Sequence, residues 1–261
     1  MPRKVTYRQR FTNKLLEGGE SPTKPNPLTQ RKPVDPGLQQ QYLEGKLILI
    51  NKPLHWTSFD VIRKLRSIIQ IKKIGHAGTL DPLATGLLIV CTGKFTKNIN
   101  TYMAQEKEYT GSITLGAVTP TYDLESEPVG QKDFTFVTDL LIQNATKKLT
   151  GDINQLPPAY SAIKKDGVAL YELARKGVEV NIEPRKVHIK SFELTRVELP
   201  SVHFKVVCST GTYIRSLAHD FGIVLGCGAY LSSLCRTRIG QFTLEDSIEM
   251  EEFERQILQT L

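Results

Sequence analysis

The sequence predicts an α/β (α+β) fold in which helices flank a mixed, largely antiparallel sheet. Two kinds of segment support this prediction. Short segments are either continuously apolar or alternate between apolar and polar residues, as buried and half-buried strands do. Longer segments place their apolar residues on one helical face. A third feature, the Pro-Pro-broken stretch at about 152–184, predicts an inserted arm outside the sheet.

The composition is typical of a globular protein with one good core. The 261 residues are 40% hydrophobic and 23% charged, which is ordinary for a soluble protein. No apolar run approaches the roughly 20 residues that cross a bilayer, and the N-terminus lacks the apolar core of a secretory signal. We therefore expect a cytoplasmic protein without a membrane partner. The four cysteines form no C-x-x-C pair, which predicts small core residues in a reducing compartment and no metal site.

The composition of residues 1–43 predicts a disordered basic extension. These residues are polar, rich in Pro, Lys, Arg and Gln, and without hydrophobic periodicity. A tail of this kind either adds non-specific affinity for RNA or is an inert extension. The folded domain is expected over 44–261.

The first half of the folded domain should alternate strands with helices. Continuous apolar runs predict buried strands at 46–50 and 87–91, and clean alternation predicts a strand at 107–116. Between them, apolar residues at helical spacing predict helices at 57–70 and 93–103, the first opening on a Thr-Ser cap.

The loop at 75–86 (GHAGTLDPLATG) is the segment around which we expect the chain to be organised. Its three glycines and one proline exclude an ordinary helix or strand. Pro82 restricts Asp81 to extended or turn geometry and so fixes the direction of its carboxylate. A carboxylate on a stiff loop beside a buried strand suits chemistry. The alternative is that Asp81 only closes an Asx-turn and that His76 only packs.

A polar loop and an amphipathic helix should follow at 119–130 and 136–149. The loop contains Asp123, Glu125 and Glu127, but their spacing does not match an octahedral metal site, so we expect a solvated loop.

The arm at 152–184 should contain a turn and a short helix. Asp166-Gly167 predicts the turn, and 168–176 predicts a helix stopped by Gly177. Its basic side chains could close on a polyanion; they are Lys164, Lys165, Arg175 and Lys176.

After the arm, the pattern predicts two strands, a helix, a strand and a helix. Residues 187–197 alternate with one phase slip, which predicts a strand with a bulge, and 202–208 alternate cleanly. Apolar spacing predicts helices at 213–225 and 245–258, with a last strand at 237–242 between them.

Charge supplies two further observations. Arg215 falls in the first turn of the predicted 213–225 helix, where a cation opposes the helix dipole at a cost of up to about 1 kcal/mol that a nearby carboxylate would reverse. The chain has a net charge of +7 and a pI of about 9.1, with its basic residues in clusters. Such clusters suit a phosphate backbone, although each alone also fits a solvated face. The clusters are Lys72-Lys73, Lys94 with Lys97, Lys147-Lys148, Lys164-Lys165, Arg175-Lys176, Arg185-Lys186, and Arg236 with Arg238.

Several separated blocks, in order, resemble the TruB family of tRNA pseudouridine synthases over about residues 45–242. They are Lys52-Pro53, GHAGTLDPLATGLL at 75–88, KEYTG at 107–111, QLPPAYSAIKKDGVALYELARKG at 155–177, GTYIRSLAHDFG at 211–222, and Leu-x-Arg-Thr at 234–237. The resemblance implies the pseudouridine synthase fold, with a catalytic domain over 44–261 and an RNA-binding arm. It also implies an isomerase that converts the T-loop uridine of tRNA, at position 55, to pseudouridine.

The resemblance assigns catalytic roles to three residues. Asp81 would be the essential aspartate, and Arg215 would pair with it. Tyr109 would stack near the target base, with a role in deprotonation. This fits elementary chemistry, since breaking a glycosidic bond needs a carboxylate near the sugar and an arginine keeps a buried carboxylate ionised and oriented. Attack on C1′ and removal of the 2′ hydrogen both remain open.

Substrate-binding roles are implied for five more residues. Tyr213 and Leu234 would line the base pocket, and His76 would help to extrude the nucleotide, because a stacked uridine must be flipped out to react. Lys52 and Lys97 match the family pattern with less defined roles. The reaction is an isomerisation, so no cofactor or metal is expected. The expected partner is the T-stem-loop of tRNA, and the protein is expected to be a monomer.

Two departures from the family pattern stand out. Many bacterial relatives have a C-terminal RNA-binding domain of the PUA type, for which a chain ending at Leu261 leaves no room, so acceptor-stem contacts are expected to be missing. Cys235 precedes Arg236 where relatives often have two arginines, which predicts a weaker phosphate contact. The alternatives are an RNA-binding protein or tRNA folding chaperone with incidental catalysis, and a hydrolase with an Asp nucleophile. A guide-dependent relative is disfavoured by the short chain.

Overall fold

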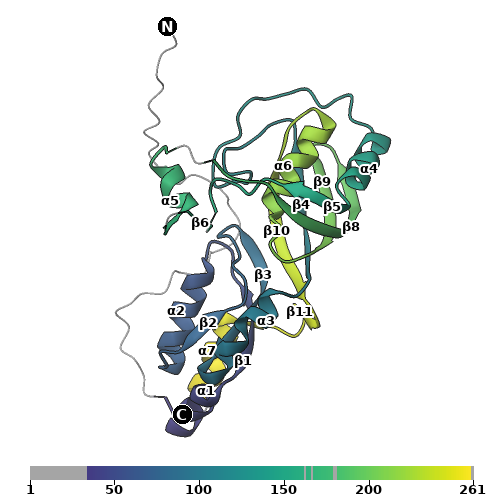
Figure 1. Ribbon diagram of the computed structural model, residues 1–261. Helices are drawn as coiled ribbons and strands as arrows, with labels where there is room; N and C mark the ends of the chain where they lie inside the picture. The colour runs from purple at the N-terminus through teal and green to yellow at the C-terminus, as the bar shows by residue number, and fades with distance from the viewer. Residues whose placement is uncertain (1–33, 162, 166, 179–180, 260–261) are drawn as a thin grey trace.

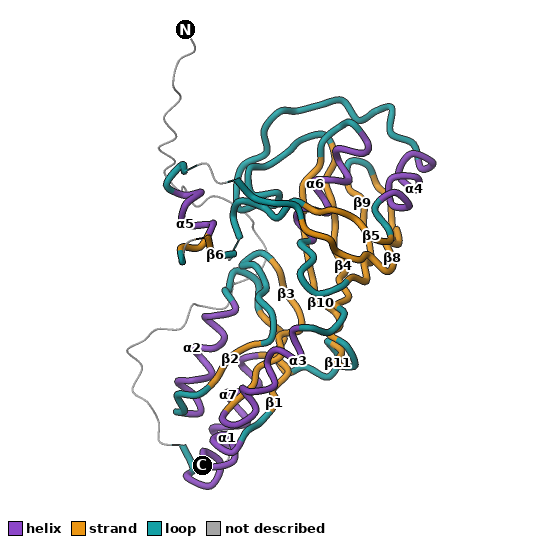
Figure 2. Tube along the Cα trace, viewed as in Figure 1, coloured by secondary structure: helices purple, strands orange, loops and turns teal. Residues whose placement is uncertain are grey.

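The computed structural model describes residues 34–161, 163–165, 167–178 and 181–259 (Figures 1 and 2). Most of the predicted N-terminal extension, residues 1–33, lies outside the described residues. The strands are β1 (Leu47–Lys52), β2 (Ile74–His76), β3 (Ala84–Thr92), β4 (Lys107–Leu115), β5 (Gly151–Gln155), β6 (Lys164–Lys165), β7 (Val168–Ala169), β8 (Arg185–Glu198), β9 (Ser201–Cys208), β10 (Ala229–Ile239), β11 (Phe242–Thr243) and β12 (Ile248–Glu249). The helices are α1 (Pro36–Glu44), α2 (Ser58–Ile69), the 3₁₀ helix η1 (Gly93–Asn98), α3 (Ile99–Met103), α4 (Asp139–Lys148), α5 (Leu170–Arg175), α6 (Ile214–Leu225) and α7 (Met250–Gln259).

One long sheet runs through the molecule in the order β12-β1-β3-β10-β4-β9-β8-β5. The orange strands in Figure 2 pass from the lower half through β3 and β10 into the upper half. The pairs β1–β12 and β3–β10 are parallel, and the other strand pairs described for this sheet are antiparallel. The predicted mixed, largely antiparallel sheet flanked by helices is therefore confirmed.

The two larger of the three hydrophobic clusters that the described residues form along this sheet lie in its lower and upper halves. In the lower half α1, α2 and α7 pack around β1 and β3, with Leu65, Ile69 and Phe253 among the buried residues. In the upper half α4 and α6 cover β4, β8, β9 and β10, with Phe204 and Phe221 at the centre. The strands β3 and β10 join the two halves, so residues at their ends lie where the halves meet. No helix among the described residues is long and apolar enough to cross a membrane.

The prediction of disorder is wrong for residues 36–43, which lie in α1. Asp35 caps this helix by accepting a hydrogen bond from the Leu38 amide at 2.7 Å, and Pro36 occupies its first turn. Tyr42 is buried and its ring meets Phe253 of α7 edge-on. The sequence did not predict this helix because its core contacts come from Tyr42 and the half-buried Leu38, which are too few to give a hydrophobic periodicity.

The predicted loop at 75–86 also contains more sheet than expected. The short strand β2 pairs with the far end of β3, and β3 begins at Ala84 instead of Leu87. Gly86 makes this early start possible, since its φ of 101° and missing side chain let β10 approach closely. The loop that carries Asp81 is therefore only 77–83.

The remaining differences concern β5, β10, the helix predicted at 93–103 and the arm. The segment 151–155 is a strand paired with β8, so the arm leaves the sheet after Gln155 and not at residue 152. The last long strand is β10 at Ala229–Ile239, and only its end overlaps the strand predicted at 237–242. The predicted helix at 93–103 is divided into η1 and α3.

Two local predictions of backbone shape are confirmed. The β8–β9 pairing contains register shifts, as the phase slip in 187–197 predicted. In the arm, Lys165 pairs with Val168, which agrees with a chain reversal at 166–167, although residue 166 itself lies outside the described residues.

Candidate active site

The loop that carries Asp81 is fastened on both sides of this residue. On one side, the Ser58 hydroxyl accepts a hydrogen bond from the Leu80 amide at 2.8 Å and contacts the Leu80 carbonyl at 3.1 Å. On the other side, the His55 amide donates to the Pro82 carbonyl at 2.8 Å. Because the loop is held at 80 and 82, the backbone between them has little freedom, and the Asp81 carboxylate keeps one direction.

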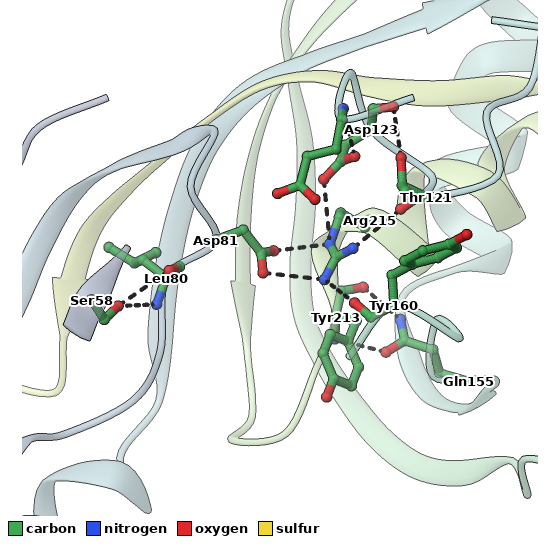
Figure 3. A network of polar contacts seen from close by, with 10 residues as sticks. Ser58, Leu80, Asp81, Thr121, Asp123, Gln155, Tyr160, Tyr213 and Arg215 are labelled. Atoms are coloured by element: carbon green, nitrogen blue, oxygen red, sulfur yellow. Dashed lines mark hydrogen bonds and ion pairs between the residues drawn. The ribbon is translucent and has the colours of Figure 1, made fainter. Parts of the chain in front are cut away.

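Arg215 of α6 meets this carboxylate with two nitrogen atoms (Figure 3). Nε lies 2.9 Å from Oδ2, and Nη2 donates to Oδ1 at 3.1 Å. The Arg215 side chain is 5% exposed, whereas that of Asp81 is 33% exposed. A two-nitrogen contact fixes both the position and the plane of a carboxylate. The cation is thus held inside the protein, and the carboxylate remains open to a ligand.

A second carboxylate, Asp123, shares the same guanidinium. Its Oδ2 lies 3.6 Å from Arg215 Nε, and the residue is buried. Burial raises the pKa of Asp123, and the Asp81 charge raises it further, against the opposing effect of Arg215. The prediction that Asp123 belongs to a solvated loop is therefore wrong. The surrounding sequence gave no signal, because its neighbours Leu124 and Glu125 are exposed and polar spacing continues on both sides.

Backbone carbonyl groups complete the surroundings of the Arg215 guanidinium. Nη1 donates to the Thr121 carbonyl at 3.2 Å, and Nη2 donates to the Tyr160 carbonyl at 3.1 Å. The arginine at the start of α6 is therefore neutralised by two carboxylates and two carbonyls, as its unfavourable place at the helix start requires.

A pocket opens directly beside the two carboxylates. Its lining residues come from three elements, the Asp81 loop with the start of β3, the 119–130 loop, and β10; they are Asp81, Leu83, Ala84, Asp123, Leu231, Ser232, Ser233 and Leu234. Leu234, which is predicted to line a base pocket, pairs with Ala84 in the parallel β3–β10 ladder. The pocket therefore places the partly exposed Asp81 carboxylate beside largely apolar walls.

Tyr109 lies nearby in β4 but is buried, with 8% of its surface exposed. Its hydroxyl accepts a hydrogen bond from Arg236. Burial raises the pKa of Tyr109, and the Arg236 charge opposes this rise. The phenol is thus neutral at physiological pH, and its oxygen is held by a buried cation.

Arg236 itself is not available to a phosphate group. It is 1% exposed, and it donates to the carbonyls of Leu87 at 2.8 Å and Gly78 at 3.1 Å. The sequence-based interpretation of this position as part of a phosphate contact is therefore wrong. Arg236 links β10 to the Asp81 loop and to the Tyr109 hydroxyl.

Tyr213 is the residue just before α6, and its backbone is held by Gln155 at the end of β5. The Gln155 amide nitrogen donates to the Tyr213 carbonyl at 3.0 Å, and its oxygen accepts from the Tyr213 amide at 2.8 Å. Figure 3 shows this pair together with Tyr160 in the network around Asp81 and Arg215.

His76 and Lys52 have pKa values lowered by burial. His76 ends β2, and its pKa is lowered by burial and then by the Arg236 charge, so its ring is neutral at physiological pH. Burial lowers the pKa of Lys52 to about 8, with the Asp81 charge opposing. The Lys52 ammonium is fully buried and donates to the carbonyls of Pro53 at 2.9 Å and Trp56 at 2.5 Å. In the structure Lys52 therefore supports the backbone beneath the Asp81 loop, and its expected role in substrate binding stays a prediction.

Lys97 is not part of this site. It is exposed in η1, which follows the end of β3 opposite to Ala84. The structure thus brings together Asp81, Arg215 and Leu234 from the sequence-based set, with Tyr109, Tyr213 and Lys52 close behind them. Any contact of Lys97 with a ligand would be made elsewhere on the surface.

Comparisons with known proteins agree on one family. The model of the TruB family pseudouridylate synthase N-terminal domain matches residues 66–214, and that of the tRNA pseudouridylate synthase B C-terminal domain matches 215–260. The tRNA pseudouridine synthase B of Flavobacterium johnsoniae is 50% identical over 225 residues, which cover 84% of this chain and 98% of that protein. Its counterpart from Bacteroides fragilis is 47% identical over 218 residues, covering 81% and 94%.

A solved structure gives the same picture of the fold. A Cbf5-Nop10-Gar1 complex contains a chain that is 29% identical, with a TM-score of 0.65. The match covers 90% of this chain but 60% of the other, so this chain spans less than two thirds of that structural relative.

Proposed function

The chain belongs to the TruB family of pseudouridylate synthases, and from this premise we propose how its site works. Like the relatives from Flavobacterium johnsoniae and Bacteroides fragilis, it is a tRNA pseudouridine synthase, an isomerase that acts on uridine in tRNA. We propose that its target is the T-loop uridine at position 55, that it binds the T-stem-loop as a monomer in the cytoplasm, and that Asp81 is its catalytic residue.

One observation carries this assignment. Asp81 is the partly exposed member of an ion pair whose cation is buried, and it borders the pocket between β3 and β10. Isomerisation breaks the bond from uracil N1 to C1′ and forms one from C5 to C1′. A carboxylate that stays ionised and oriented beside the ribose is the group this reaction needs, either as a nucleophile or as a base. Arg215 is proposed to hold the Asp81 carboxylate in that orientation.

The base is proposed to enter the pocket after it leaves the RNA stack. Leu234 supplies an apolar wall, and Tyr213 and Tyr109 are proposed to border the uracil ring. Because burial lowers the pKa of His76, the ring is neutral and can occupy the space that the flipped nucleotide leaves without carrying a charge into it. Lys97 is proposed to contact a phosphate away from the target nucleotide. The segment between Gln155 and β8 is proposed to be the RNA-binding arm.

Replacing Asp81 with Asn tests the assignment. Asp81→Asn should abolish pseudouridine formation, measured by mass spectrometry of tRNA after incubation, while the dissociation constant for tRNA changes less than about threefold. The matched control is Asp133→Asn, which changes an exposed carboxylate on a remote loop and should keep full activity.

Three outcomes would contradict the proposal. Normal product formation by Asp81→Asn would remove Asp81 from the chemistry. Release of free uracil by the wild type would indicate hydrolysis instead of isomerisation. Restoration of a synthase-deficient strain by Asp81→Asn would favour a role in RNA folding.

A further inference from the structure

The ring of Tyr213 is covered by an arginine that lies outside the sequence blocks on which the family resemblance rests. Arg185, the first residue of β8, places its guanidinium carbon 4.5 Å from the centre of the Tyr213 ring. The same carbon would lie 3.7 Å from a side chain at Gly211. The guanidinium therefore lies over the Tyr213 ring and beside Gly211, within the distance of a cation–π contact.

Arg185 and Gln155 reach Tyr213 from the same side of the sheet. They lie directly opposite each other in the antiparallel β5–β8 ladder, and residues opposite each other project to one face. Gln155 is fully buried and holds both backbone polar groups of Tyr213. Those two hydrogen bonds place the backbone but leave the ring free to turn about its side-chain bonds. Arg185 supplies the contact that limits this rotation.

The surroundings of Arg185 argue against a free phosphate-binding group. Its Nε is buried and makes no hydrogen bond, so one of the nitrogens used in a two-pronged phosphate contact is turned into the protein. Lys186, the next residue, is exposed and projects to the other face of the strand. Of the basic pair, Lys186 is exposed, whereas Arg185 is half-buried with its Nε turned into the protein.

The segment that leaves the sheet after Gln155 is fastened to the start of α6 at two more points. The Ser216 hydroxyl donates to the Leu156 carbonyl at 2.7 Å, and Arg215 donates to the Tyr160 carbonyl at 3.1 Å. The arm leaves the sheet at Gln155 and returns to it at Arg185. Both residues that hold Tyr213 are thus the residues at which the arm joins the sheet.

We propose that Arg185 is a positioning residue, which together with Gln155 fixes the Tyr213 ring at the base pocket and so couples the root of the arm to that pocket. The inference rests on the proposed role of Tyr213 beside the flipped base. It differs from the phosphate-contact interpretation of the basic pair, because Arg185 acts on the reaction through an aromatic ring and not through the RNA backbone.

A double-mutant cycle tests the coupling. Arg185→Gln is made in the wild type and in a Tyr213→Leu background, and the single-turnover rate of pseudouridine formation is measured at saturating enzyme. In the wild type the rate should fall about 3- to 10-fold, which corresponds to the usual coupling of residues in contact. In the Tyr213→Leu background Arg185→Gln should have no further effect. Arg185→Lys should restore only part of the rate, since an ammonium does not stack flat on a ring.

Binding measurements separate the two interpretations of Arg185. The affinity of Arg185→Gln for tRNA, and its dependence on salt, should match the wild type. Lys132→Gln removes an exposed positive charge outside the basic clusters and should leave the single-turnover rate unchanged. The proposal is overturned if Arg185→Gln slows both backgrounds equally, or if it weakens binding and lowers the salt slope by about one phosphate contact.

Folding and activity are checked independently of the cycle. Thermal unfolding of each variant identifies a misfolded protein. If Arg185→Gln is misfolded, it is replaced by Arg185→Met, which keeps the aliphatic stem. Arg185→Met must then show the same loss of coupling. A wild-type protein that makes no pseudouridine would instead contradict the proposed function.

Discussion

At the scale of single residues, the site depends on one buried guanidinium shared by two unequal carboxylates. Asp81 is partly exposed and Asp123 is enclosed. Removing a buried charge from water is costly unless partners surround it, and Arg215 finds both carboxylates and two carbonyls. Asp123 therefore partners Arg215 inside the protein, and Asp81 is the carboxylate that remains partly exposed at the pocket.

Replacing Asp123 with Asn should lower the rate without removing tRNA binding. The variant leaves Arg215 with a weaker partner, so the guanidinium can shift toward Asp81 and hold it in a less reactive position. We expect a rate at least about 10-fold lower, the usual effect of losing a hydrogen bond to a charged group. Single-turnover assays measure it. Glu127→Gln, an exposed change in the same loop, is the control, and an unchanged rate for Asp123→Asn would show that Asp123 does not support Arg215.

Asp220 of α6 should make the protein less stable as the pH rises. Burial raises its pKa from 3.8 to about 6, so between these values the folded state binds a proton that the unfolded state has lost. The free energy of unfolding therefore falls as the pH rises from about 4 to about 6, and the full cost applies at pH 7.

Asp220→Asn removes this cost. It should raise the free energy of unfolding at pH 7 by about 1 kcal/mol, less than the whole pKa shift would give because the group is partly exposed to water. Below about pH 4 the two proteins should be equally stable. Urea unfolding at pH 4 and 7 measures the difference, with the exposed Glu183→Gln as control. Equal stability at both pH values would contradict the burial of this carboxyl group.

At the scale of elements, the Asp81 loop depends on how closely β3 and β10 approach. A side chain at Gly86 would lie 2.4 Å from the Arg236 carbonyl and 2.6 Å from its amide nitrogen. These atoms belong to backbone that cannot move without disturbing the ladder. The parallel β3–β10 contact thus fixes the start of β3, and the loop before it, relative to Leu234.

Gly86→Ala and Gly130→Ala separate steric contact from backbone strain. Both glycines have positive φ values, 101° and 65°, but nothing lies within 4 Å of a side chain at Gly130. Gly130→Ala should cost about 1 kcal/mol through backbone strain, and Gly86→Ala should cost about 1–3 kcal/mol more through overpacking. Chemical unfolding gives both values. Similar losses of stability in the two variants would mean that the strands separate easily at Gly86.

Sequence patterns predicted the elements that one local rule governs. Helices α2 and α6 and strands β4 and β9 follow hydrophobic periodicity and were found within a few residues of their predicted ranges. The extent of β10 was not predictable, since its middle carries Ser232, Ser233 and Arg236, which serve the pocket and the Asp81 loop instead of a core. These residues interrupt the alternation of apolar and polar side chains on which the strand prediction depended.

The site itself was predictable in part. The contact between Asp81 and Arg215, which are 134 residues apart, was predicted from two observations. Arg215 lies in the first turn of a helix, where a cation is unfavourable, and the family resemblance pairs it with Asp81. Asp123 was missed because burial is decided by tertiary contacts that a polar loop does not encode. The same limitation applies to Arg236, whose place in a basic cluster suggested phosphate but whose side chain the fold directs to backbone carbonyls.

At the scale of the whole molecule, positive charge is spread over the surface and is not concentrated at the catalytic residues. The chain carries a net charge of +7, while the cations nearest to Asp81 are buried and occupied by protein groups. Binding of RNA must therefore come from exposed lysines and arginines around the site, whose contribution depends on salt.

Lys97→Ala should weaken tRNA binding and reduce its dependence on salt. If Lys97 contacts one phosphate, the slope of log K against log salt should fall by about 0.7–0.9, while the single-turnover rate at saturation stays unchanged. Fluorescence titrations at several salt concentrations measure the slope. Lys132→Ala, another exposed cation, is the control; an unchanged slope for Lys97→Ala would remove Lys97 from the RNA interface.

The position of β10 between β3 and β4 has a consequence for how the protein becomes active during translation. Asp81 is synthesised 134 residues before Arg215, and β10 follows later still, so at ordinary elongation speeds the nascent chain lacks these parts for on the order of ten seconds. During that interval the ribosome-bound polypeptide lacks Arg215, the partner of Asp81, and it lacks β10, the strand that lies between β3 and β4 in the sheet. If Asp81 has the proposed catalytic role, the nascent chain becomes active only after β10 has emerged.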